Sequence, residues 1–154
     1  MFRGINSLSL DVKGRMAMPA KYRERLIAES NSQLIVTIDP DPEDHCLWLY
    51  PLPVWEAIER ILDSLPSLDK AAQKIRRILI GHATECELDG QGRLLLPPPL
   101  RAMAKLDKQI TLVGQGKKFE IWDETIWVAR RETWMAEDSQ DYAELSDGLK
   151  NLSL

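Results

Sequence analysis

The 154-residue sequence has few cysteines and no long hydrophobic run. Its two cysteines, Cys46 and Cys86, stand beside apolar residues, which is typical of reduced, partly buried thiols and argues against a disulfide framework. No apolar stretch approaches the roughly 18 residues that a membrane helix needs, and the first residues have no secretory pattern. We therefore expect a cytoplasmic protein without a membrane partner.

The sequence also lacks the complete motifs of catalysis and of metal binding. Residues 90–92 and 114–117 resemble phosphate loops, but neither segment forms a full motif, and no nucleophile is set beside a base. The pairs His45-Cys46 and His82-x-x-x-Cys86 do not have the spacing of structural zinc sites. The acids of residues 39–44 either hold a divalent ion or form a solvated hairpin loop. We expect no catalytic residue, no metal ligand and no cofactor. Enzymatic activity is the first alternative function to be tested.

The net charge of −4 argues at first against nucleic acid, because phosphate binding requires a positive surface. The charges are unevenly distributed. Residues 1–25 contain six basic side chains and two acidic ones, whereas residues 132–154 contain six acidic side chains and one basic one. The basic N-terminal part is therefore compatible with a nucleic-acid partner.

An internal repeat organises the chain. Residues 10–23 match residues 88–101 at six of 14 positions, where chance would give about one. Residues 47–55 match residues 119–127 in the same order, after a shorter intervening loop in the second copy. The sequence therefore contains two copies of one structural unit.

Each copy is predicted to form a hairpin, a short helix, a second hairpin and a longer helix. Asp11 and Gly14 are typical of a tight turn, in which the carboxylate accepts backbone N–H groups and the glycine adopts a positive φ. Pro19 is suited to the start of a short helix in which Tyr22 and Leu26 share one face. Residues 39–44 and their counterparts 114–117 are predicted hairpin loops.

The remaining segments are predicted to be mainly helical. Residues 54–65 and 68–80 have helical periodicity, and Gly81 is expected to end the second helix. The basic face of that helix is assigned to solvent or to a subunit interface. A further helix is predicted from Asp123 as N-cap through Trp127 and Trp134, and the tryptophans are expected to pack in the core. An amphipathic tail segment is predicted from Tyr142, Leu145, Leu149 and Leu152.

The two turns, Asp11 to Arg15 and Asp89 to Arg93, in a tandem repeat of this size resemble the paired motif of the MraZ family. The resemblance extends to residues 1–4, 49–53 and 81–83. It implies an α+β, mainly β fold: a duplicated AbrB/SpoVT-like swapped-hairpin β-barrel, formed as a pseudo-dimer within one chain, with flanking helices. It further implies AbrB/SpoVT-like domains at 5–53 and 81–124, linker helices at 54–80, and a C-terminal helix with an acidic tail at 125–154.

The same resemblance implies a sequence-specific regulator of transcription, with repression preferred, that controls the cluster of division and cell-wall genes including its own. Such a protein is nucleoid-associated and binds direct repeats in double-stranded promoter DNA as a ring-shaped homo-oligomer. The alternative is a ring-forming scaffold that does not bind specific DNA and whose acidic tail recruits other partners.

We predict that Arg3, Lys13 and Arg15 contact DNA, with Arg3 near the other two, because lysine offers a point charge to phosphates and arginine a planar fork to guanine. The structural alternative is that Arg15 only pairs with Asp11 to hold the turn.

The second turn carries Gln91 in place of Lys13, and residues 81–108 have equal numbers of acids and bases. We therefore give Arg93 a mainly structural or interface role. The predicted motif residues are Asp11, Gly14, Asp89, Gly92 and Arg93. The helix residues Lys21, Arg23 and Arg25 either touch the DNA backbone or form a solvated face.

Overall fold

The computed structural model describes residues 1–137, and the chain divides into two compact units, residues 1–124 and 125–154. The described part is mixed α+β with mostly antiparallel strands and five helices. The elements of the first copy and of the connection that follows it are β1 Ile5–Ser9, β2 Arg15–Ala17, α1 Ala20–Ser30, β3 Gln33–Ile38, β4 Cys46–Pro51, α2 Leu52–Ser64 and α3 Lys70–His82. The elements of the second copy are β5 Thr84–Glu87, β6 Arg93–Leu95, α4 Pro98–Met103, β7 Gln109–Gly114, β8 Phe119–Asp123 and α5 Glu124–Ala136.

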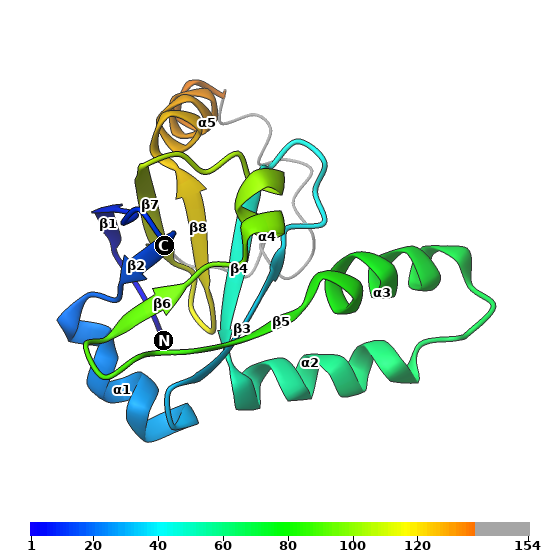
Figure 1. The fold of residues 1–154 in the computed structure, drawn as a ribbon. Helices are drawn as coiled ribbons and strands as arrows, with labels where there is room; N and C mark the ends of the chain where they lie inside the picture. Colours follow the sequence, from blue (N-terminus) through cyan, green and yellow to red (C-terminus); the bar gives the residue numbers. More distant parts are fainter. Residues whose placement is uncertain (138–154) are drawn as a thin grey trace, which may run out of the picture. The chain divides into compact units, whose positions relative to one another are not determined.

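The two copies share their sheets. The larger sheet has the strand order β1-β7-β8-β4-β3-β5, and the smaller one consists of β2 and β6 (Figure 1). Strand β1 of the first copy pairs with β7 of the second, and β5 of the second copy pairs with β3 of the first. The sequence pattern predicts a hairpin at the start of each copy without naming the partners of its strands. The turn joins β1 to β2, but each strand takes its ladder partner from the other copy.

One hydrophobic core fills the space between the two copies. Met16 and Met18 of the first copy and Leu94 and Leu96 of the second are fully buried in it. Phe2 reaches the same core, where its ring centroid lies 4.3 Å from that of Phe119. Both copies therefore contribute equivalent residues to one shared core.

The short helices begin where the prolines predict. Helix α1 follows Pro19 and buries Tyr22 and Leu26, and α4 follows Pro97 and buries Leu100. Helix α1 ends at its C-cap Asn31, which adopts a left-handed conformation with φ 51°. The predicted start and buried face of the helix after Pro19 are therefore confirmed.

Helices α2 and α3 form an antiparallel hairpin that projects from the sheet (Figure 1). A second hydrophobic cluster joins them to the sheet through Ile35, Tyr50, Trp55, Leu62 and Leu79. The expectation that Gly81 ends the second helix is wrong by one residue, because α3 continues to His82 and Ala83 is its C-cap. Gly81 is exposed within the last turn, so it does not supply the left-handed cap that the prediction required.

The tryptophans of the first unit pack as predicted, with Trp55 and Trp122 almost fully buried and Trp48 half-buried. Helix α5 begins directly after Asp123, and in the second unit the rings of Trp127 and Trp134 lie 5.9 Å apart. Trp127 is buried, but Trp134 is exposed, so the expectation that Trp134 packs in the core is wrong. The predicted amphipathic tail lies outside the described residues. Among residues 1–137, the helices are too short or too polar to cross a lipid bilayer.

Candidate nucleic-acid interface

The Asp11 carboxylate organises the first turn. Its Oδ1 atom accepts hydrogen bonds from the backbone N–H groups of Lys13 and Arg15, both at 2.9 Å. Its Oδ2 atom accepts a charge-assisted hydrogen bond from Arg15 Nε at 2.6 Å. The main chain closes the loop, because Gly14 N donates to Asp11 O at 2.9 Å. The turn and the arginine side chain are thus fixed by one acid.

The second turn repeats this geometry. Asp89 Oδ1 accepts from the backbone N–H groups of Gln91 and Arg93 at 2.9 Å, and Oδ2 accepts from Arg93 Nε at 2.9 Å. Gly92 N donates to Asp89 O at 2.9 Å, as its counterpart does in the first turn. The bonding therefore does not distinguish the two motif arginines.

The pKa values of Asp11 and Asp89 lie below the usual range for aspartate. The largest cause is the backbone N–H of Arg15 for Asp11 and that of Arg93 for Asp89, with the arginine side chains adding to it. Hydrogen bonds to an ionised carboxylate favour its charged form. Both acids are therefore ionised at neutral pH and balance one positive charge at each turn.

The β2–β6 ribbon presents both arginines on one face. Arg15 lies opposite Leu95, and Arg93 lies opposite Ala17, so the two arginines are diagonal neighbours. Diagonal neighbours in an antiparallel pair lie about 7–8 Å apart. The side chains of Arg15 and Arg93 are 26% and 31% exposed.

The opposite face of the ribbon is apolar and turned to the core. Met16 and Leu94 face each other there and have no exposed surface. Leu95, on the outward face, is 54% exposed. The alternation along each strand therefore fixes which side chains reach solvent.

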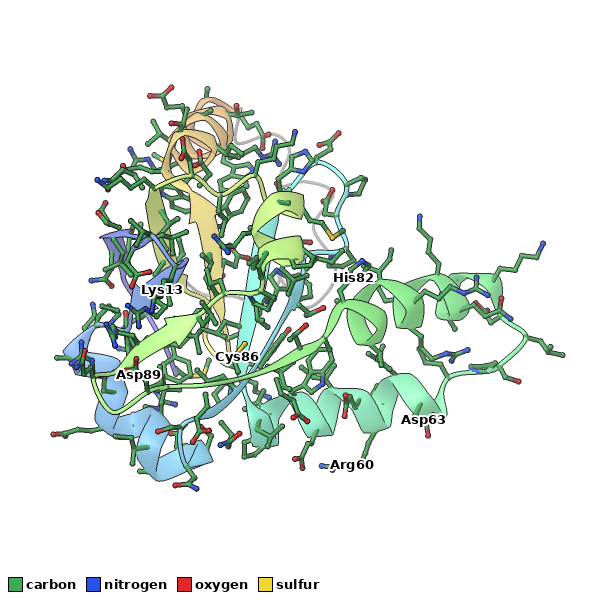
Figure 2. All side chains as sticks on the ribbon, in the orientation of Figure 1. Lys13, Arg60, Asp63, His82, Cys86 and Asp89 are labelled. Carbon is green, nitrogen blue, oxygen red and sulfur yellow. The ribbon has the colours of Figure 1, made fainter. Side chains whose placement is uncertain are left out.

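Lys13 stands exposed at the tip of the first turn, beside the fully exposed Val12. Figure 2 shows Lys13 and Asp89, which mark the two turns that lead into β2 and β6. The corresponding tip residue of the second turn is the uncharged Gln91. The tips therefore differ in charge although the turns have the same bonding.

The expectation that Arg3 lies beside Lys13 and Arg15 is wrong. Arg3 precedes β1 and Lys13 follows it, and a five-residue strand spans about 17 Å. Backbone hydrogen bonds fix the Arg3 segment against the β7–β8 hairpin, where Phe2 N donates to Gly116 O and Gly114 N donates to Gly4 O. A DNA contact by Arg3 stays a prediction, and it needs a surface separate from the ribbon.

The basic residues of α1 have individual partners. Arg25 Nε pairs with Glu29 at 2.6 Å, and Lys21 Nζ lies 4.8 Å from the ring centroid of Tyr22. Arg23 Nε donates to the backbone oxygen of Met18 at 2.6 Å. Arg101 in α4 makes the equivalent bond, with Leu96 O, at 3.1 Å. The repeat matches these two arginines in sequence, but it does not indicate their role in the structure.

Within residues 1–137, potential metal ligands come together in one place. Polar atoms of Asp39, Cys46 and Glu120 lie within 4.8 Å of one another. Burial is the main cause that raises the pKa of each of these three groups. The protonated thiol donates to Asp39 Oδ2, and Trp48 Nε1 donates to the same oxygen. Trp122 Nε1 donates to Glu120 Oε2 at 2.9 Å. Hydrogen bonds within the protein therefore account for these groups, and we assign no metal to them.

Acidic side chains of the β3–β4 loop accept hydrogen bonds from the backbone of the same loop. Asp39 Oδ1 accepts from Asp41 N at 2.8 Å, and Asp41 Oδ1 accepts from Glu43 N at 2.9 Å. Such turns are made by aspartate side chains without an ion. Between the two explanations of residues 39–44, this bonding favours the hairpin loop.

Comparison with known proteins gives consistent matches over the whole chain. The model of the MraZ protein family matches residues 1–78 and again residues 79–147. A protein of Thioalkalivibrio sulfidiphilus is 54% identical over 154 residues, which cover 100% of both chains. A protein of Methylococcus capsulatus is 56% identical over 139 residues, or 90% of each chain, and one of Halorhodospira halophila is 50% identical over the full length of both. All three relatives carry the name Transcriptional regulator MraZ.

Proposed function

Because the chain belongs to the MraZ family, it is a transcriptional regulator and not an enzyme, and we propose that it binds double-stranded DNA through the β2–β6 ribbon. The observation that carries this proposal is the pair of arginines on the outward face of that ribbon. The major groove of B-DNA admits a two-stranded β-ribbon, and arginine binds guanine O6 and N7 through two parallel hydrogen bonds.

The ion pairs support a base-reading role for Arg15. The hydrogen bond to Asp11 uses Nε, and within residues 1–137 no hydrogen bond joins the Nη atoms of Arg15 to another residue. Asp11 therefore restrains the side chain and leaves the terminal donors for a ligand. Pairing with Asp11 and binding to a base are thus compatible, and they need not be alternatives.

The two turns differ most in Lys13 and Gln91. A lysine at the tip adds a charged contact to a DNA phosphate, whereas an uncharged glutamine adds none. We therefore propose that Lys13 and Arg15 make the stronger set of contacts and that Arg93 contributes mainly through the structure of the ribbon. The outward position of Arg93 makes this unequal division the first point to test.

We also propose that the shared sheets form an AbrB/SpoVT-like swapped-hairpin barrel. The exchange of β1 and β5 between the copies, each pairing with a strand of the other, supports this assignment. The proposed domains are residues 5–53 and 81–124, with linker helices at residues 54–80 and a C-terminal helix with an acidic tail at residues 125–154.

We propose that the protein acts as a ring-shaped homo-oligomer. One ribbon offers few phosphate contacts, and each contributes only about −0.9 to the slope of log affinity against log salt concentration. Several ribbons in one ring bind tandem direct repeats by avidity if the repeats recur about every 10 bp, on one face of the duplex. We propose a cytoplasmic, nucleoid-associated repressor of its own division and cell-wall gene cluster.

The proposal is tested by fluorescence anisotropy with a labelled duplex from the protein's own upstream region, over a series of salt concentrations. Wild type is compared with Lys13→Gln, Arg15→Ala and Arg93→Ala. Light scattering first measures the oligomer size of each protein, and binding is compared between preparations of equal size. Lys70→Gln, on the exposed end of α3, is the control for loss of one positive charge.

We expect Arg15→Ala to weaken specific binding by about 1–3 kcal/mol and Lys13→Gln to reduce the salt slope by about one unit. Arg93→Ala should have a smaller effect, and Lys70→Gln none. Full binding by Arg15→Ala and Arg93→Ala at equal oligomer size contradicts the ribbon as the DNA site. Loss of assembly in Arg15→Ala supports the scaffold alternative.

A further inference from the structure

The arginine of each short helix covers the glycine of the opposite copy's turn. A Cβ atom built on Gly92 would lie 2.5 Å from Arg23 Nε and 2.8 Å from Arg23 Cδ. A Cβ atom built on Gly14 would overlap the guanidinium of Arg101 in the same way. Gly14 and Gly92 are buried, with φ values of +83° and +72°. Each turn therefore has a guanidinium packed directly against its backbone.

A chain of hydrogen bonds joins each arginine to the turn that it covers. Arg23 Nε donates to Met18 O, and Met18 N donates to Gly92 O at 2.9 Å. In the other half, Arg101 Nε donates to Leu96 O, and Leu96 N donates to Gly14 O at 3.1 Å. The two halves thus brace each other reciprocally, and the braced glycine immediately precedes the motif arginine.

We propose that Arg23 and Arg101 are positioning residues, each of which holds the Asp-x-x-x-Arg turn of the other copy. Arg101 fixes the turn that carries Arg15, and Arg23 fixes the turn that carries Arg93. A mobile turn would have to be ordered when DNA binds, at a cost in entropy, so a braced turn binds more tightly. The consequence for DNA affinity rests on the proposed function, whereas the bracing of the turns does not.

Hydrogen exchange of the free protein tests the bracing directly. The relevant amides are those of Gln91, Gly92 and Arg93 in one turn, and those of Lys13, Gly14 and Arg15 in the other. Arg23→Met should accelerate exchange in the 91–93 turn by about tenfold or more and leave the 13–15 turn unchanged. Arg101→Met should give the reverse pattern.

Arg25→Met is the matched control, because Arg25 lies in the same helix but pairs with Glu29 and packs over the Phe2 ring. It should leave both turns unchanged. If Arg23→Met does not fold, Arg23→Lys is measured instead, since lysine keeps the charge but lacks the planar group that covers Gly92. Unchanged exchange at residues 91–93 in the folded variant overturns the proposal, as does equal acceleration in both turns.

A double-mutant cycle on DNA affinity then tests the consequence with the same upstream duplex. Arg101→Met should weaken binding about tenfold, add little to Arg15→Ala, and add its full effect to Arg93→Ala. A merely global loss of stability would not produce this selective coupling. Coupling of Arg101→Met to Arg93→Ala instead would overturn the proposed pairing.

The two proposals fail in different ways. In one case, Arg23→Met and Arg101→Met accelerate exchange in their own turns, but Arg15→Ala and Arg93→Ala bind DNA fully. That result contradicts the ribbon as the DNA site and leaves the bracing intact. Loss of DNA binding in Arg15→Ala together with unchanged exchange in Arg101→Met contradicts the bracing and leaves the DNA site intact.

Discussion

At the scale of single residues, two glycines and two arginines determine how the turns are built. Gly14 and Gly92 adopt positive φ values, and the space where a side chain would stand is filled by an arginine of the other copy. Each glycine is therefore required for two reasons, its backbone conformation and the absence of a Cβ atom. Gly90, in the same turn as Gly92, is different, because a Cβ atom placed there would have no neighbouring atom within 4 Å.

We expect Gly92→Ala to lower the free energy of unfolding by about 1–3 kcal/mol, because alanine at positive φ is strained and its methyl group meets Arg23. Urea unfolding of wild type, Gly92→Ala and the control Gly90→Ala measures the difference. In an Arg23→Met background the loss should be smaller, since only the backbone strain remains. Equal losses in Gly92→Ala and Gly90→Ala would show that the packed guanidinium is unimportant.

Asp11 makes the stability of the first turn depend on pH. Its folded pKa lies below the unfolded value of about 3.9, mainly because the backbone N–H of Arg15 bonds to the ionised form. Its stabilising contribution is therefore present above the unfolded pKa and is lost as the pH falls through the folded pKa. The difference in unfolding free energy between wild type and Asp11→Asn should persist at neutral pH and vanish in acid. Asp63→Asn, on the exposed side of α2, is the control for the loss of one acidic side chain. A pH-independent result for Asp11→Asn contradicts this account.

At the scale of secondary structure, the α2–α3 hairpin depends on one basic residue whose role the sequence does not indicate. The sequence pattern assigns Arg76, with its basic neighbours, to solvent or a subunit interface. Its Nη1 atom instead donates to the backbone oxygens of Leu62 and Leu65, at the C-terminal end of α2. A positive charge at that end also interacts favourably with the helix dipole.

Arg76→Met should therefore destabilise the hairpin by about 1 kcal/mol, from the loss of charge-assisted bonds to two carbonyl groups. The neighbouring Arg77 is exposed, so Arg77→Met is the control for the loss of charge on α3. Hydrogen exchange of the α2 and α3 amides measures the local effect. Equal exchange in the two variants would mean that the contacts of Arg76 contribute nothing measurable.

The sequence predicts the elements better than their partners. Periodicity and Pro19 locate α1 and its buried face, because these are local properties of the chain. The pairing of β1 with β7 and of β5 with β3 joins residues that are far apart in the chain, and alternation within a strand does not specify which strand it meets. The contact of Arg23 with Gly92 could not be predicted for the same reason, since it follows from strand exchange between the copies.

At the scale of the whole molecule, the repeat explains why both motifs lie on one ribbon. The two turns belong to different copies, yet β2 and β6 pair directly, so Arg15 and Arg93 share an outward face. Local rules predict each turn from residues such as Asp11 and Gly14. The residue patterns alone do not predict the common face, because it depends on how the two copies pair, and the family resemblance implies only that their hairpins interleave.

The central claim is that the outward face of the β2–β6 ribbon contacts DNA, and site-specific crosslinking tests it most directly. A photoreactive group is attached to Ala17→Cys, which is exposed on the ribbon opposite Arg93, and to Ala28→Cys on the exposed side of α1 as control. The native Cys46 is buried and Cys86 is half-buried, and a preparation without either introduced cysteine corrects for their labelling. We predict that the upstream duplex is crosslinked from position 17 and not from position 28. Crosslinking from position 28 alone, or from neither position under conditions where the duplex is bound, would contradict the account.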